Sequence, residues 1–128
     1  RDMEEPEERY IERHHITVFT VDEVREKSTA GIARLIQDKL QSCDLIYVSF
    51  DVDSMDPELV SRGTGTPAPH GLSPKEASDL LDAFAGWSKT CCMEVVEINP
   101  CLDDKVNKMA ETAFEILESF THTIENRI

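Results

Sequence analysis

The sequence has few basic residues: 13 lysines and arginines stand against 26 aspartates and glutamates, giving a net charge of −13. This balance disfavours nucleic acids and anionic membranes as partners, and it suits metal ions or substrates that carry guanidinium or ammonium groups. Long apolar runs are missing too. The longest, around residues 45–50, is far shorter than the roughly 20 residues that cross a membrane, so we expect no membrane partner.

Paired cysteine motifs are also absent. The four cysteines show neither a C-x-x-C pair nor a zinc-binding spacing: Cys43, Cys91, Cys92 and Cys101. We therefore expect them to be reduced and mostly buried. The first ten residues are charged throughout and lack the apolar segment of a signal peptide. These features predict a cytoplasmic protein, and the absence of an initiator methionine favours a fragment or a processed product.

Strand and helix patterns alternate along the 128 residues, a length that predicts one domain at most. β-Branched or continuous apolar runs predict strands, and apolar residues at helical spacing predict helices. In chain order we expect an acidic loop (1–13), a strand (16–20), a helix in two parts (about 20–41), a strand covered on both faces (44–50), a long loop (54–73), a helix (73–85), a strand (91–98) and a helix (103–123). This order predicts an α/β fold with a parallel sheet and flanking helices.

Carboxylates follow two of the expected strands. Asp51 and Asp53 come directly after residues 44–50, and Glu97 lies near the end of residues 91–98. Parallel sheets place ligands beyond the carboxyl ends of their strands, so we expect these carboxylates to share one edge. Clustered carboxylates repel one another unless a cation joins them, and hard divalent ions prefer oxygen ligands. The alternatives are a solvated acidic turn for the aspartates and a strand-end salt bridge for Glu97.

Two known carboxylate motifs resemble this segment. An EF-hand is excluded because the acids are spaced 1, 3 and 6 and follow a strand. "FDVDS" resembles the Asp-x-Asp motif of haloacid-dehalogenase-type phosphatases, which would make Asp51 a nucleophile and Asp53 an acid/base in a Mg²⁺-dependent enzyme. That alternative needs a later strand that ends in paired acids, for which Asp103 and Asp104 are a weak substitute.

Three segments together resemble the arginase/agmatinase (ureohydrolase) family, with a pattern nearest to arginase. They are "SFDVDSMDP" (49–57), "GTGTPAPHGLS" (63–73) and "EVVEINP" (94–100), and they match in order over most of the chain. The opening "RDMEE" resembles the family segment that holds the amino-acid end of the substrate. The resemblance implies the C-terminal strands and helices of a three-layer αβα fold, with residues 1–128 as the C-terminal part of an arginase-like domain.

The family hydrolyses a guanidinium group to urea and an amine with two Mn²⁺ ions, so the resemblance implies conversion of arginine to ornithine and urea. By position, Asp51 resembles the carboxylate that bridges both ions, and Asp53 resembles a ligand of one ion. Glu97 resembles the acid that pairs with the substrate guanidinium. Asp2 and Glu4 resemble residues around the α-amino group of the substrate.

The loop threonines Thr64 and Thr66 are expected to shape the wall of the substrate pocket, with a plain tight loop as the alternative. The histidine ligands of the family and its "DAHxDxR" segment have no counterpart, and His70 stands where the family usually has glycine. We therefore expect about half of the metal shell, no activity from these residues alone, and a partly exposed sheet edge. The complete protein would form a trimer or hexamer. A non-catalytic assembly module is the other alternative.

Overall fold

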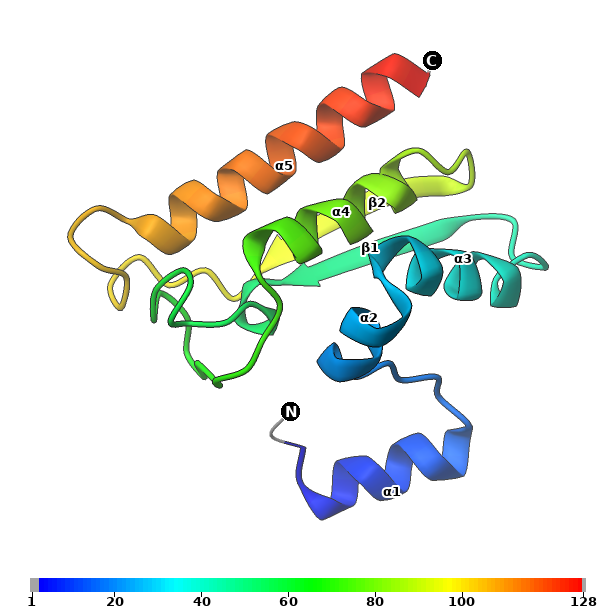
Figure 1. Ribbon diagram of the computed structural model, residues 1–128, viewed down its shortest axis with the longest axis horizontal. Coiled ribbons are helices and arrows are strands. Elements are labelled where there is room, and N and C mark those ends of the chain that lie inside the picture. Colours follow the sequence, from blue (N-terminus) through cyan, green and yellow to red (C-terminus); the bar gives the residue numbers. More distant parts are fainter. Residues whose placement is uncertain (1–2, 128) are drawn as a thin grey trace.

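The computed structural model of the protein describes residues 3–127 (Figure 1). Its helices and strands follow one another as α1 (Glu5–His14), α2 (Val21–Lys27), α3 (Thr29–Lys39), β1 (Ile46–Asp51), α4 (Pro74–Ala85), β2 (Thr90–Val96) and α5 (Lys108–Arg127). The two strands pair in parallel to form one sheet. The predicted class, a parallel sheet with flanking helices, is therefore confirmed.

One face of the sheet forms the core together with α4 and α5. Phe50 of β1 is 5% exposed, and Val48, Met93 and Val95 pack against the same apolar cluster. The helices α4 and α5 run side by side along the sheet (Figure 1). The start of α4 is fixed by a capping box, in which the amide of Glu76 donates to Ser73 Oγ at 3.2 Å. This core holds the carboxyl ends of β1 and β2 on rigid backbone.

The opposite face of the sheet is open to solvent, so the prediction that residues 44–50 are covered on both faces is wrong. Tyr47 is 56% exposed, and Ser49 and Glu94 are exposed as well. Ser49 Oγ donates to Glu94 Oε1 at 2.7 Å across the strands. A hydrogen bond to Glu94 also raises the pKa of Tyr47 to about 12. Among residues 3–127 the sheet has two strands, so within this part of the chain each strand has one unpaired edge, as expected.

The amino-terminal elements differ from the predictions. Residues 16–20 are not a strand, because the described part of the chain offers them no neighbouring strand to pair with. The expected loop at residues 1–13 contains α1, which has a proline in its first turn and three acids near its positive end. All of its residues are exposed except Ile11, which is partly exposed, and α1 lies apart from the sheet (Figure 1).

The last helix begins five residues later than predicted. Asp103 and Asp104 do not join α5; their carboxylates accept hydrogen bonds from its first amides instead. Apolar side chains of α5 lie on its exposed side as well, since Phe114 and Leu117 are exposed. The residues of α5 that are buried are Met109, Ala113, Ile116 and Phe120.

The cysteines are free, but the prediction that most of them are buried is wrong. Cys43 is partly exposed, and Cys91, Cys92 and Cys101 are exposed. Cys92 lies on the open face of the sheet, opposite Tyr47 in the strand register. Among residues 3–127, no helix is long and apolar enough to cross a membrane.

Candidate active site

The ends of β1 and β2 bring the candidate carboxylates to one edge of the sheet. Asp51 is the last residue of β1, and its register partner is Val96, the last residue of β2. Glu97 therefore leaves the sheet beside Asp51. The two carboxylates interact, because the negative charge of Glu97 helps to raise the pKa of Asp51. This is the placement expected from the sequence.

Asp51 and Asp53 are joined by a short 3₁₀ turn, Val52–Ser54. The amide of Asp53 donates to Asp51 Oδ1 at 3.1 Å, and Ser54 Oγ donates to the carbonyl oxygen of Asp51 at 2.7 Å. The pKa of Asp51 is raised above its ordinary value, first by burial and then by the nearby charges of Asp53 and Glu97. The turn therefore holds two like charges close together.

The "GTGTP" segment (63–67) lies beside the carboxylates of both Asp53 and Glu97. Thr66 Oγ1 donates to Asp53 Oδ2 at 2.9 Å. A Cβ added to Gly65 would lie 3.8 Å from Glu97 Oε2, so this part of the loop passes directly by the Glu97 carboxylate. Both Gly65 and Thr66 are exposed, which leaves this side of the carboxylates open to a ligand.

The first part of the loop is fixed against the segment between β2 and α5. The amide of Asn99 donates to the carbonyl oxygen of Gly63 at 2.8 Å, and the Ser61 hydroxyl donates to Asp103. A Cβ on Gly63 would come within 2.7 Å of both Asp103 and Met109, so only glycine allows this approach. Sequence reasoning missed the role of Asp103, because its partner Ser61 lies 42 residues away in the chain.

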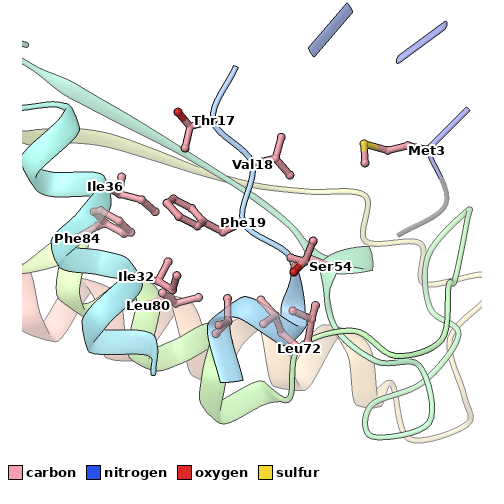
Figure 2. A pocket seen from close by; sticks show the side chains of 13 residues that line it. Met3, Thr17, Val18, Phe19, Ile32, Ile36, Ser54, Leu72, Leu80 and Phe84 are labelled. Atoms are coloured by element: carbon pink, nitrogen blue, oxygen red, sulfur yellow. The ribbon is translucent and has the colours of Figure 1, made fainter. Parts of the chain in front are cut away.

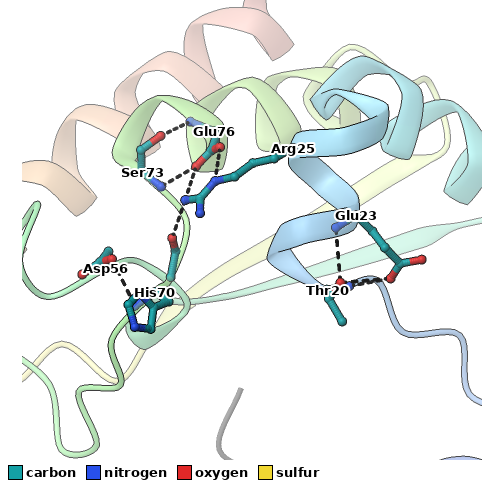
Figure 3. A network of polar contacts seen from close by, with 8 residues as sticks. Thr20, Glu23, Arg25, Asp56, His70, Ser73 and Glu76 are labelled. Atoms are coloured by element: carbon teal, nitrogen blue, oxygen red, sulfur yellow. Dashed lines mark hydrogen bonds and ion pairs between the residues drawn. The ribbon is translucent and has the colours of Figure 1, made fainter.

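The last part of the loop is held by Arg25 of α2 (Figure 3). Arg25 Nε donates to Glu76 Oε1 at 3.1 Å, and Arg25 Nη2 donates to the carbonyl oxygen of Gly71 at 3.0 Å. Asp56 Oδ2 accepts the amide of His70 at 3.1 Å (Figure 3). Arg25 thus ties α2 to the start of α4 and to the loop, a contact that no local sequence pattern indicates.

Glu97 has an unusual backbone conformation. Its φ angle is 66°, in the left-handed region that non-glycine residues seldom occupy. Such strain is concentrated at functional sites, where the surrounding structure holds it in place. At Glu97 the backbone turns out of the strand, and its carboxylate is exposed beside the loop that carries Gly65.

The donor atoms at this edge suit a hard divalent cation in part. Asp51 and Asp53 offer carboxylate oxygens within one turn. Burial is the main cause of the raised pKa of Asp51, and the charges of Asp53 and Glu97 add to it; a cation would offset these charges. Within residues 3–127, however, no three histidine, cysteine, aspartate or glutamate side chains converge on a point where they could hold a metal ion. The two aspartates fit part of a metal site.

The other predicted residues lie away from this edge of the sheet or outside residues 3–127. Asp2 lies outside the described residues. Glu4 is the N-cap of α1, and its amide donates to Glu7 Oε2 at 2.8 Å. His70, at a φ of 63°, is exposed and contributes its amide to the loop.

An apolar pocket of about 500 Å³ lies beside the site (Figure 2). Val18 and Phe19, from the segment before α2, form one wall of the pocket. Ile36 of α3 and Phe84 of α4 also line it. Ser54, next to the aspartates, lies at its border. The lining is mostly apolar and includes no charged side chain, so the groups that could bind a cation are those of the carboxylate edge.

A comparison with protein families matches residues 1–122 to the Arginase family. The chain belongs to this family. It is 33% identical to the arginase of Bacillus subtilis over 119 aligned residues. The aligned residues make up 93% of this chain and 40% of that enzyme. The chain thus spans about 40% of the length of the curated relatives it matches.

Solved structures match most of the described arrangement. The crystal structure of the Bacillus subtilis arginase matches with a TM-score of 0.86 at 32% identity, covering 94% of this chain and 44% of that one. The proclavaminate amidino hydrolase of Streptomyces clavuligerus matches with a TM-score of 0.81 at 33% identity, over 93% of this chain and 38% of its own. Formimidoylglutamase from Bacillus subtilis, at 24% identity and a TM-score of 0.89, covers 97% of this chain and 39% of its own, and shows the shared fold.

Proposed function

We propose that this chain forms the C-terminal part of a dinuclear manganese hydrolase that cleaves a guanidinium substrate, arginine, to urea and ornithine. The observation that supports this proposal is the meeting of Asp51, Asp53 and Glu97 at one sheet edge, beneath the loop that carries Thr66. Membership of the arginase family favours this chemistry over the phosphatase alternative.

Asp51 and Asp53 are the residues that would hold manganese, with Asp51 shared between two ions in the complete enzyme. Bound manganese would supply a nucleophile from water near neutral pH. The chain itself positions the ligands: the Asp53 amide donates to Asp51, and Thr66 donates to Asp53. Two carboxylates alone leave most of each ion to water, so we propose that these residues alone bind manganese weakly and do not turn over substrate.

Glu97 would bind the guanidinium group. A planar guanidinium prefers a carboxylate partner with paired, charge-assisted hydrogen bonds. This contact would hold the central carbon of the group facing Asp51 and Asp53, which is a positioning effect. Hydrolysis would add the water oxygen to that carbon, where it becomes the oxygen of urea, and would break the bond to the alkyl nitrogen. That nitrogen would leave with both protons of the water, as an ammonium group that carries the charge of the guanidinium. Asp2 and Glu4 would face the amino-acid end of arginine.

The setting we propose for the complete protein is the cytoplasm, as a homo-oligomer of three or six chains. Its partner is a small guanidinium compound, in keeping with the net charge of −13. A non-catalytic assembly module with the same fold would keep the sheet and helices without any need for the carboxylates to bind a cation.

Manganese binding distinguishes these two functions. In a titration of the 128-residue chain with Mn²⁺, followed by the electron paramagnetic resonance signal of the free ion, Asp51→Asn is expected to weaken binding roughly 10-fold or more. The matched control is Asp79→Asn, which removes an equal charge from an exposed ion pair with Lys75 on α4. Equal binding by wild type, Asp51→Asn and Asp79→Asn would contradict the proposed site and favour the assembly module.

A further inference from the structure

We propose that Thr66 is a positioning residue whose hydroxyl group orients Asp53 for binding of a divalent cation, an inference that rests on the function proposed above. The sequence points to Thr66 as part of a pocket wall. The structure adds a direct contact with a candidate metal ligand, because Thr66 Oγ1 donates to Asp53 Oδ2 at 2.9 Å.

The direction of this hydrogen bond follows from the chemistry of the two groups. An ionised carboxylate only accepts hydrogen bonds, and a threonine hydroxyl has a single proton to donate. Thr66 therefore donates its hydroxyl hydrogen bond to Asp53, and its oxygen lone pairs can still accept hydrogen bonds. Those lone pairs would suit the N–H groups of a guanidinium bound at this edge of the sheet. A hydroxyl is neutral, so it fixes the carboxylate without competing with a cation for its charge.

The contact with Thr66 restrains one carboxylate oxygen of Asp53. A different hydrogen bond restrains Asp51. Asp51 Oδ1 accepts the amide of Asp53 at 3.1 Å, so the orientation of Asp51 is set within the 3₁₀ turn. The side chain of Asp53 extends towards the loop, 13 residues further along the chain. Thr66 thus sets the geometry between two aspartates that would otherwise repel each other.

Thr66 can perform this role because its loop is anchored on both sides. Gly63 accepts the amide of Asn99 at 2.8 Å on one side, and Gly71 accepts Arg25 Nη2 at 3.0 Å on the other. A hydrogen bond from a fixed loop restricts the rotamers of its partner more than one from a mobile loop does. When a group that orients a metal ligand in this way is removed, the metal affinity typically falls by about 10- to 100-fold.

The neighbouring Thr64 offers a natural comparison. It is 1% exposed, and its Oγ1 has no hydrogen-bond partner within residues 3–127. Two threonines of one loop, two residues apart, therefore differ in the feature at issue: one hydroxyl contacts Asp53 and the other contacts no polar group.

The test compares Mn²⁺ affinities of Thr66→Val, Thr66→Ser and Thr64→Val in the 128-residue chain, by the resonance signal of the free ion. Valine has the shape of threonine without the hydroxyl, so Thr66→Val is expected to raise the Mn²⁺ dissociation constant roughly 10-fold or more. Thr66→Ser keeps the hydroxyl and should restore affinity to within about threefold of wild type, by the same principle. Thr64→Val should leave the dissociation constant unchanged. Circular dichroism and thermal unfolding confirm that each variant is folded.

Asp53→Asn separates the failure of this inference from the failure of the proposed function. If Asp53→Asn weakens Mn²⁺ binding and Thr66→Val does not, the positioning role of Thr66 is wrong and the metal site stands. If Thr66→Val and Thr64→Val weaken binding alike, the effect is one of loop packing, which also overturns the inference. Binding that is identical in wild type and every variant, or absent even from wild type, contradicts both the positioning role of Thr66 and the proposal that these residues alone bind manganese.

Discussion

At the scale of the residue, close backbone approaches fix the site as much as the polar side chains do. Gly71 lies against the chain that follows β1, where an added Cβ would come within 2.5 Å of the Met55 carbonyl carbon and 2.6 Å of the Asp56 nitrogen. Both of these are backbone atoms that cannot rotate away. The amide of Leu72 then donates to the carbonyl oxygen of Ser54 at 2.9 Å. The loop returns to the aspartates only because Gly71 has no side chain.

Replacement of this glycine should therefore destabilise the protein. We expect Gly71→Ala to lower the free energy of unfolding by about 1–3 kcal/mol, because the added methyl group overlaps backbone. Gly31→Ala is the matched control: its Cβ would meet the Ser28 hydroxyl at 3.4 Å in α3. In a helix this change should stabilise by about 0.5–1 kcal/mol. Urea unfolding measures both changes, and a neutral Gly71→Ala would show that the approach is looser than described.

At the scale of the element, α5 shows what sequence patterns can and cannot predict. Helical spacing correctly predicts an amphipathic helix in this part of the chain, but not its bounds: α5 starts five residues after the predicted start and ends at Arg127 instead of residue 123. The start depends on Asp103, which accepts hydrogen bonds from Met109 and Ala110 at 3.2 and 3.1 Å and from Ser61. The local pattern around α4 is complete in itself, since Ser73, Pro74 and Glu76 form its capping box, and that helix begins where predicted.

The capping role of Asp103 should make stability depend on pH. Burial alone would raise its pKa, but hydrogen bonds from Ser61 and from the amides of Ala110 and Met109 outweigh burial and lower the pKa. Because the folded-state pKa lies below the unfolded value, the ionised carboxylate stabilises the fold above about pH 4. This contribution is lost as the pH falls through the lower, folded-state pKa.

Asp103→Ala is expected to cost about 1–2 kcal/mol near pH 7, as for the loss of a helix cap. The difference in unfolding free energy between wild type and Asp103→Ala should shrink as the pH falls below about 4. Chemical unfolding at a series of pH values measures this difference. A difference that stays constant down to acid pH would show that the charge of Asp103 is not what holds the start of α5.

At the scale of the whole molecule, the sequence predicts where the candidate carboxylates lie better than it predicts the elements around them. The order Asp51, Asp53 and Glu97 at strand ends follows from parallel pairing, and the structure has this arrangement. Burial of β1 and pairing of residues 16–20 depend on neighbours in space, which sequence patterns do not reveal. The sheet face at Tyr47 is open, and residues 16–20 are not paired with a strand. Both features occur in a chain that spans about 40% of the length of its curated relatives.

Release of urea from arginine in saturating Mn²⁺ tests the central claim most directly. We expect urea release by the protein expressed from its complete reading frame, and roughly 100-fold less, or none, from Asp51→Asn and Glu97→Gln. Asp79→Asn, on the exposed surface of α4, should keep full activity, and residues 1–128 alone should release no urea. Activity that survives Asp51→Asn and Glu97→Gln, or urea release by the 128-residue chain that Asp51→Asn abolishes, would contradict this account.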